Sequence, residues 1–211
     1  MKRQAVTLLL ILTVCIASGC VKESEKKSDS KNPSEKSAAL PAKKQTKLKL
    51  YVTAAEAYDK WKADPENVKI LDVRSPEEYI FVGHPEMAWH IPLKIATYEM
   101  VDGKPTLTMK VTPDFVERVK KVFKPTDTIL ITCRSGGRSA AAVNLLADEG
   151  FKNVYNITDG FEGDAVKDPK SPDHGKRVKN GWKNSGKPWT YEPSPEKMLL
   201  PAEVLKPEAE K

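Results

Sequence analysis

The stretch that decides the fold runs from Thr128 to Glu149 and reads TILITCRSGGRSAAAVNLLADE. Its first five residues are mostly apolar or β-branched, which predicts a buried strand, and the part from Ser139 onward predicts a helix. Between them lies a short loop that begins at Cys133. Free N–H groups at a helix N-terminus, together with the helix dipole, stabilise an anion. The loop therefore favours a thiolate at Cys133 and predicts a cysteine nucleophile.

The other loop residues fit the same chemistry. Gly136 and Gly137 permit backbone angles that turn successive N–H groups toward one point, which forms an anion-binding nest. Arg134 and Arg138 add positive charge for an anionic sulfur or phosphorus substrate. A buried structural cysteine is the alternative interpretation, and the glycines and arginines around it disfavour that interpretation. The predicted substrate-binding residues are Arg134, Ser135, Gly136, Gly137, Arg138 and Ser139.

Two separated motifs resemble the signatures of the rhodanese family of sulfurtransferases. The loop from Cys133 to Ser139 is similar to the family's active loop, and Cys133 stands at the position of its persulfide-forming cysteine. Two motifs in the right order argue against a chance agreement. The second motif reads Leu71-Asp-Val-Arg74, Glu78-Tyr79, Gly83-His84 and Ile91-Pro92.

The resemblance spans roughly Leu48 to Gly163 and has two departures. The family often has Gly-Ala before its Ile-Pro pair, where this chain has Met87-Ala-Trp-His90. It also often has a Gly-Gly pair with a nearby Trp after the last strand, where this chain has Asp159-Gly-Phe-Glu-Gly-Asp164. Both departures lie at the rim of the expected pocket, so they bear on substrate choice rather than on the fold.

The resemblance implies an α/β fold: a rhodanese-like domain with about five mainly parallel strands flanked by helices. The chain's own pattern agrees, because short apolar runs alternate with helical segments. Helices are expected to begin at the capping sequences of Thr53 and Ser75 and at Thr112. Strands are expected at residues 48–52, 68–73, 88–93, 128–132 and 154–157.

The resemblance also implies an activity. Cys133 would take the outer sulfur of thiosulfate or a related persulfide and pass it to cyanide, a thiol or a protein cysteine, without cofactor or metal. Asp72 and Arg74 are expected to form an ion pair that supports the loop. The alternative is a carrier that delivers sulfur, or selenium by similar chemistry, to one protein partner. A non-catalytic interaction domain is disfavoured because the cysteine is present.

Cysteine phosphatases and related arsenate reductases share this loop architecture and are the rival enzymes. Their loop has five residues between the cysteine and the arginine, because it encircles a tetrahedral oxyanion. Only four residues separate Cys133 from Arg138, and position 139 is serine. The shorter loop resembles the sulfurtransferase form, which accommodates a terminal sulfur, and disfavours a phosphatase on geometric grounds.

The N-terminus resembles the export signal of a bacterial lipoprotein. Two cationic residues precede an apolar run that is too short to span a membrane, and Ser18-Gly19 immediately precede Cys20. Residues 1–19 are therefore expected to be removed and Cys20 to be lipidated, which anchors the protein to a bacterial membrane. Residue 21 is valine rather than the aspartate that is linked to inner-membrane retention in bacterial lipoproteins. The resemblance therefore implies the outer membrane, with the protein facing the periplasm. An ordinary secretory signal is the alternative.

Removal of Cys15 with the signal and lipidation of Cys20 would leave Cys133 as the only thiol of the mature protein. No disulfide could then form within the chain. Without a second thiol to receive it, the sulfur must pass to an external acceptor.

Residues 20–47 are expected to form the lipidated cysteine and a disordered tether rich in Lys and Ser. The chain of 211 residues carries a net charge of +6, and this segment explains its sign. Residues 21–47 hold eight lysines against four acids, whereas residues 48–211 hold 25 basic and 25 acidic residues. The balanced part lacks the basic excess that nucleic-acid binding requires.

The segment from Tyr98 to Met109 is read as an insertion. Asp102-Gly103 lies between two partly alternating runs and predicts a hairpin, although Pro105 weakens its second arm. A surface hairpin without a functional role is favoured over one that edges the pocket.

Residues 164–211 form a Pro- and Lys-rich extension beyond the predicted domain of residues 48–163. Disordered segments are poor in aromatic residues. Trp182, Trp189 and Tyr191 therefore predict that the extension docks onto the domain. A strap over apolar surface is favoured over a lid on the active loop.

Overall fold

The structure is a computed structural model that describes residues 40–202, 204 and 205. The predicted signal peptide (residues 1–19), the predicted lipidation site Cys20 and most of the predicted tether lie outside the described residues. None of the helices in the described part is long and apolar enough to cross a lipid bilayer.

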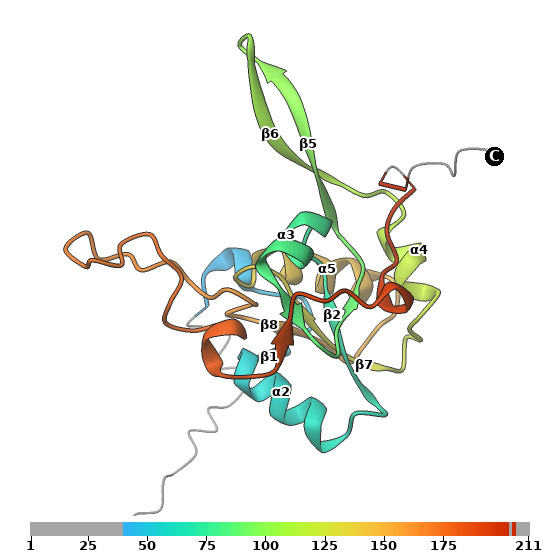
Figure 1. Ribbon diagram of the computed structural model, residues 1–211. Coiled ribbons are helices and arrows are strands. Elements are labelled where there is room, and N and C mark those ends of the chain that lie inside the picture. The colour runs from blue at the N-terminus through green and yellow to red at the C-terminus, as the bar shows by residue number, and fades with distance from the viewer. Residues whose placement is uncertain (1–39, 203, 206–211) are drawn as a thin grey trace, which may run out of the picture. The chain divides into compact units, whose positions relative to one another are not determined.

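A five-stranded sheet forms the centre of the domain, and all of its strand pairs are parallel (Figure 1). β7 (Thr128–Thr132) lies in the middle and pairs with β2 (Val68–Asp72) and β8 (Val154–Ile157). The carboxyl ends of parallel strands share one edge, where α/β proteins bind their ligands, and Cys133 follows β7 at that edge. The strand order is β1 (Tyr51–Val52), β8 (Val154–Ile157), β7 (Thr128–Thr132), β2 (Val68–Asp72) and β4 (Trp89–His90).

Four α-helices accompany this sheet. Both capping boxes expected from the sequence are present: the side chains of Thr53 and Ser75 accept the N–H groups of Glu56 and Glu78. The two helices therefore begin where the sequence predicted. The helices are α2 (Ala54–Ala63), α3 (Pro76–Val82), α4 (Phe115–Lys120) and α5 (Gly137–Asp148).

The sheet separates two buried apolar clusters, because neighbouring residues of one strand point to opposite faces. Ile129 and Ile131 of β7 belong to the cluster that contains Phe115 of α4. Leu130, between them, belongs to the cluster that contains Ala54 of α2 and Trp182. β7 is thus buried on both faces, which explains its continuous apolar run. The predicted α/β fold with five mainly parallel strands is confirmed.

The structure moves two of the predicted element boundaries. β1 starts at Tyr51 rather than Leu48, because Lys49 has a φ of 54° and a left-handed residue interrupts an extended strand. The helix expected at Thr112 starts at Phe115. Thr112 instead donates its N–H to the carbonyl of Leu93, which binds it to the segment after β4.

Ordered contacts begin before the predicted domain boundary at Leu48. The 3-10 helix η1 (Ala42–Lys44) lies against α5. Lys44 is buried, and its Nζ lies 2.7 Å from Asp164 Oδ1. Asn156 donates its side-chain N–H to the carbonyl of Lys44. This long-range ion pair and hydrogen bond hold residues 42–44 against the domain. The last residues of the predicted tether (residues 20–47) therefore contact the domain, which their Lys-rich composition did not indicate.

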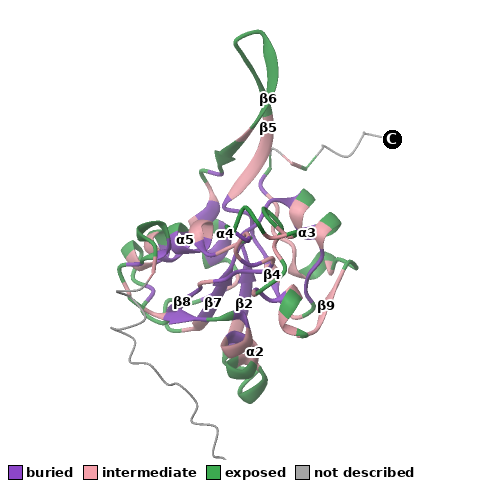
Figure 2. Cartoon of the chain, turned by 90° about the vertical axis from the view of Figure 1, so that its left-hand side faces the viewer, coloured by how far each residue is buried: buried purple, intermediate pink, exposed green. Residues whose placement is uncertain are grey.

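β5 (Lys94–Val101) and β6 (Lys104–Val111) form the predicted hairpin around Asp102-Gly103. Asp102 and Gly103 have φ values of 51° and 73°, and a two-residue type I′ turn requires a positive φ at both positions. Pro105 is accommodated because a two-stranded ladder leaves an outer edge that needs no donor. Figure 2 shows the distal part of the hairpin exposed and extending away from the sheet.

The C-terminal extension docks onto the domain. Trp182 is fully buried and packs edge-on against Tyr58 of α2, with ring centroids 5.9 Å apart. Two short 3-10 helices, η2 (Lys183–Ser185) and η3 (Pro195–Lys197), follow it. Between them, β9 (Trp189–Thr190) pairs antiparallel with β3 (His84–Pro85). Trp182 and β9 of the extension therefore pack on the domain.

Candidate active site

Cys133 lies at the point where β7 ends and α5 begins. The Gly136 N–H donates to its sulfur, with N and Sγ 3.2 Å apart. Gly136 is the N-cap of α5, so the sulfur faces a helix N-terminus, where negative charge is stabilised. Cys133 is only 1% exposed, so the thiol is buried within its loop.

A hydrogen-bonded chain leads from the sulfur to Asn156 on β8. Cys133 Sγ lies 3.3 Å from Ser139 Oγ, which lies 2.7 Å from Asn156 Oδ1. The Asn156 amide nitrogen donates to the carbonyls of Lys44 and Gly136, which fixes the orientation of the amide. Ser139 therefore donates its one proton to Asn156. A Cys133 thiol in this arrangement donates to Ser139 Oγ.

Deprotonation of Cys133 changes this chain. A thiolate cannot donate, so the Ser139 hydroxyl must rotate toward the sulfur to keep a hydrogen bond with it. That rotation leaves Asn156 Oδ1 without its proton donor. The N–H of Gly136 serves the sulfur in both states. Sequence reasoning missed Asn156, since an isolated asparagine inside a strand carries no signal.

The segment after β8 backs the loop so closely that it requires glycine. Gly136 has a φ of 94°, and a Cβ there would lie 2.2 Å from the carbonyl oxygen of Thr158. A Cβ on Gly160 would lie 2.5 Å from the carbonyl oxygen of Cys133. The Phe161 N–H donates to that same carbonyl at 2.7 Å. Backbone contacts thus fix the loop from behind.

Arg138 forms a two-pronged ion pair with Glu78 of α3. Its Nη1 and Nη2 donate to the two carboxylate oxygens at 2.5 and 2.6 Å. Burial raises the pKa of Glu78, but the hydrogen bonds and charge of Arg138 and the Ser75 N–H outweigh it and hold the pKa below its ordinary value. The sequence placed Glu78 only in the helix cap and in the family signature, without a partner in the loop.

Asp72 and Arg74 pair in the core beneath the site. Arg74 Nη2 lies 2.6 Å from Asp72 Oδ2, and both side chains are fully buried. The same guanidinium donates to the carbonyl of Gly83 at 2.7 Å and lies 4.2 Å over the ring of Phe161. Arg74 thereby joins the end of α3 to the segment that backs the loop.

A pocket of about 470 Å³ opens beside the loop. Its first wall is α3 with its cap, through Ser75, Glu77 and Glu78, and its second wall is Arg134 and Arg138. The third wall comes from the hairpin. The sequence had favoured a surface hairpin without a functional role over one that edges the pocket, and the hairpin does edge this pocket. The hairpin residues in this wall are Ala96, Tyr98, Leu107 and Met109.

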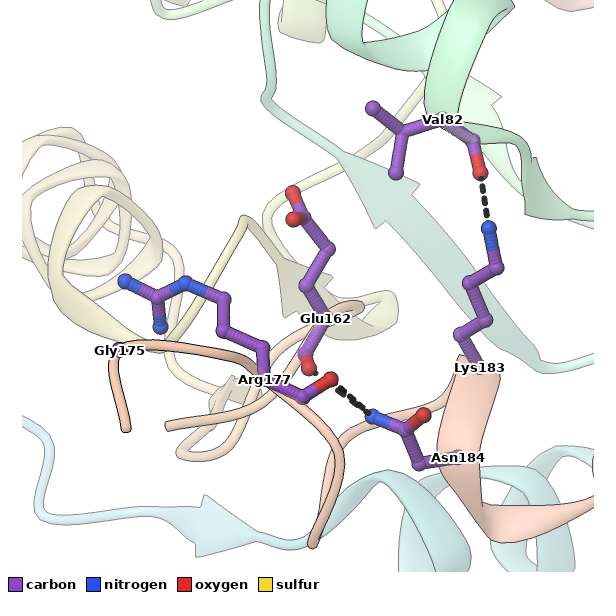
Figure 3. Close-up of a pocket in the computed structure, with 6 residues that line it drawn as sticks. All are labelled: Val82, Glu162, Gly175, Arg177, Lys183 and Asn184. Atoms are coloured by element: carbon purple, nitrogen blue, oxygen red, sulfur yellow. Dashed lines mark hydrogen bonds between the residues drawn. The ribbon is translucent and has the colours of Figure 1, made fainter. Parts of the chain in front are cut away.

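A second pocket, of about 430 Å³, lies between the end of α3 and the C-terminal extension (Figure 3). Lys183 donates to the carbonyl of Val82 at 2.9 Å, and Asn184 donates to the carbonyls of Glu162 and Arg177. These polar groups hold the extension in place. None of the described residues of this extension lines the pocket beside the loop, which fits a strap better than a lid.

Two histidines pack on Tyr79 beneath α3. His84 and His90 stack on its ring with centroid distances of 3.6 and 4.1 Å. Burial lowers the pKa of His90 to about 4, so its ring is neutral at physiological pH. No group of three or more His, Cys, Asp or Glu side chains among residues 40–202, 204 and 205 is arranged to hold a metal ion.

Together, the parallel sheet and a cysteine at the N-terminus of α5 are the features of an α/β domain of the sulfurtransferase superfamily. The chain belongs to the rhodanese-like domain family, whose model matches residues 53–165. The matched range contains Cys133 with its loop, Asp72 with Arg74, and the hairpin.

Relatives support the same assignment. The chain is 31% identical over 130 residues to the uncharacterized protein RP600 of Rickettsia prowazekii, covering 59% of this chain and 85% of that protein. It is 36% identical over 93 residues to thiosulfate sulfurtransferase 16 of Arabidopsis thaliana, a chloroplastic protein, covering 44% and 70%. The crystal structure of Rv0390 from M. tuberculosis matches with a TM-score of 0.51 and 25% identity, covering 67% of this chain and 96% of that one.

Proposed function

We propose that this protein is a sulfurtransferase that moves sulfane sulfur through a persulfide on Cys133. One observation carries the proposal: the Cys133 sulfur accepts the Gly136 N–H at the N-terminus of α5. A persulfide is an anion, so the same N–H groups and helix dipole would stabilise it. The likeness to a plant thiosulfate sulfurtransferase supports the same class of reaction.

The reaction has two halves. The Cys133 thiolate attacks the outer sulfur of thiosulfate or a related persulfide donor, and a sulfur–sulfur bond forms at Sγ. The sulfur–sulfur bond of the donor breaks, and its electron pair leaves with the sulfite or the donor thiolate. An acceptor such as cyanide, a thiol or a protein cysteine then attacks the outer sulfur, and the electron pair returns to Sγ.

The polar residues have distinct parts in this proposal. Ser139 keeps a hydrogen bond to the sulfur by rotating between Asn156 and Sγ as the proton leaves and returns. Arg134 is exposed at the pocket wall and meets the anionic donor. Arg138, paired with Glu78, holds α3 against the loop and supplies less net charge than an unpaired arginine.

A carrier that hands sulfur, or selenium, to one protein partner is the second candidate. The burial of Cys133 bears on this candidate, because a persulfide at that depth is shielded from solvent and would persist until an acceptor opens access to it. Repeated turnover with a small thiol would favour the enzyme. A stable persulfide that is released only to one protein would favour the carrier.

The decisive experiment is the intact mass of the purified protein before and after incubation with thiosulfate. We expect one added sulfur that disappears on later addition of cyanide. Cys133→Ala is the matched control and should gain nothing. An unchanged mass of the wild-type protein, in a sample whose Cys133 still reacts with an alkylating reagent, would reject the proposed chemistry.

The proposed setting is an exported lipoprotein, tethered by Cys20 to a bacterial outer membrane and facing the periplasm. The support is the sequence alone: the charged start, the short apolar run and the Ser18-Gly19-Cys20 junction. Cys20→Ser should move the protein from the membrane fraction to the soluble fraction. Unchanged membrane association of this variant would contradict the anchor.

A further inference from the structure

The hairpin has one apolar face and one polar face. Directly paired residues of an antiparallel ladder share a face, and alternate pairs lie on opposite faces. The pairs Ala96–Met109 and Tyr98–Leu107 therefore lie on one face, followed by Met100–Pro105. The intervening pair, Thr97–Thr108, lies on the other face, where the two hydroxyl oxygens are 2.8 Å apart.

The apolar face turns toward the active loop. Both of its inner pairs, Ala96–Met109 and Tyr98–Leu107, line the pocket that Arg134 and Arg138 of the active loop also line. The larger side chains are open to solvent, with Tyr98 78% and Leu107 58% exposed. Exposed apolar side chains gathered at a pocket mark a binding site for an apolar group.

The charges around the pocket balance. Arg138 is paired with Glu78, and the exposed Arg134 shares the pocket with the exposed Glu77. Two cations against two anions attract a dianion such as thiosulfate less strongly than two unpaired arginines would. A donor with a single negative charge on its sulfur and an apolar body fits the lining better.

We infer that this pocket selects sulfur donors in which an apolar group adjoins the anionic sulfur, of the thiosulfonate class R–SO2–S⁻. The inference rests on the proposed sulfur transfer at Cys133. The Cys133 thiolate attacks the outer sulfur, the sulfur–sulfur bond of the donor breaks, and its electron pair leaves with the sulfinate R–SO2⁻. The group R lies against Leu107 and Met109, and the sulfinate oxygens face Arg134.

The test compares two donors of equal charge, benzenethiosulfonate and methanethiosulfonate. For the wild-type protein, kcat/KM should be at least about tenfold higher with the benzene compound, a typical effect of filling a hydrophobic pocket. The double variant Leu107→Ala, Met109→Ala should bring the two values together. Val101→Ala shortens an exposed apolar side chain on the other face of the hairpin and should keep the wild-type ratio.

Two results would overturn the inference: equal kcat/KM values for the two donors in the wild-type protein, or an unchanged ratio in the double variant. Melting temperatures of all three proteins check that the substitutions leave the fold intact. Binding of benzenesulfinate, measured by calorimetry, tests the pocket without turnover. Tight binding that is lost in the double variant, in a protein that forms no persulfide, would keep the pocket and reject the proposed function.

Discussion

The active loop and the β5–β6 hairpin form two walls of one pocket and are built in opposite ways. The loop has a buried cysteine, and its polar groups Ser139 and Arg138 are held by partners from distant parts of the chain, Asn156 and Glu78. The hairpin is held mainly by its own ladder and exposes apolar side chains. The rigid wall suits bond making and breaking, whereas the exposed wall suits recognition of a substrate and tolerates change.

The sharpest test of this difference uses two glycines with positive φ. Gly136→Ala places a Cβ against the carbonyl of Thr158, whereas nothing lies within 4 Å of a Cβ on Gly103 in the hairpin turn. Urea unfolding should show that Gly136→Ala lowers the free energy of unfolding by about 3 kcal/mol or more. The loss combines the backbone strain of a positive φ with the steric clash of the new Cβ. Gly103→Ala should lose only about 1 kcal/mol, the strain of a left-handed residue. Equal losses would contradict the comparison.

Acid should lower the free energy of unfolding of the domain through protonation of His90. The unfolded chain protonates this ring near pH 6.5, but the folded ring protonates only near pH 4. As the pH falls from 6.5 to 4.5, protons therefore bind the unfolded state first. His90 should lower the free energy of unfolding by about 2 kcal/mol over this range. Calorimetric melting of wild type and His90→Gln across this range measures that share. Parallel pH profiles of the two proteins would assign the loss to other groups.

The pair that links the loop to α3 should contribute a similar amount. Glu78→Gln keeps the shape and removes the charge, so the unfolding free energy should fall by about 1–3 kcal/mol. The folded pKa of Glu78 is lowered, so its stabilisation is full above pH 4.5 and is lost as the pH falls through the folded pKa. The difference between wild type and variant should therefore shrink in acid. A difference that stays constant with pH would exclude a charge effect.

Asn156→Asp should weaken the nucleophile and also lower the unfolding free energy, because Asn156 is fully buried and its amide donates to two carbonyls. The change removes the donors to Lys44 and Gly136 and adds negative charge two hydrogen bonds from the sulfur. Alkylation of Cys133 by iodoacetamide at neutral pH should slow by about tenfold. Asn153→Asp makes the same chemical change at an exposed position and should react like wild type. Similar slowing in both variants would contradict the chain from sulfur to Asn156.

The smallest effect is expected on the hairpin itself. Tyr98→Ser removes a ring that is 78% exposed, so the unfolding free energy should change by no more than about 0.5 kcal/mol. Urea unfolding measures it. A larger loss would show that the apolar face stabilises the fold and is less free for substrate.

Much of the fold follows from local patterns. The strands at 128–132 and 154–157 and the helix starts at Thr53 and Ser75 lie where the sequence predicted. Buried strands and capping boxes depend on adjacent residues, so neighbouring side chains suffice to specify them. The limits of the ordered domain were less predictable. The pairing of Lys44 with Asp164 joins residues 120 positions apart, and composition gives no sign of it.

The sequence by itself determined the loop and predicted its cysteine as the nucleophile, because a strand, a cysteine, two glycines and a helix start follow one another between Thr128 and Ser139. Only the tertiary structure decided which groups surround them. Ser139 meets Asn156, Arg138 meets Glu78, and the hairpin meets the loop across one pocket. Those contacts join segments far apart in the chain, and their geometry exists only once the sheet has assembled.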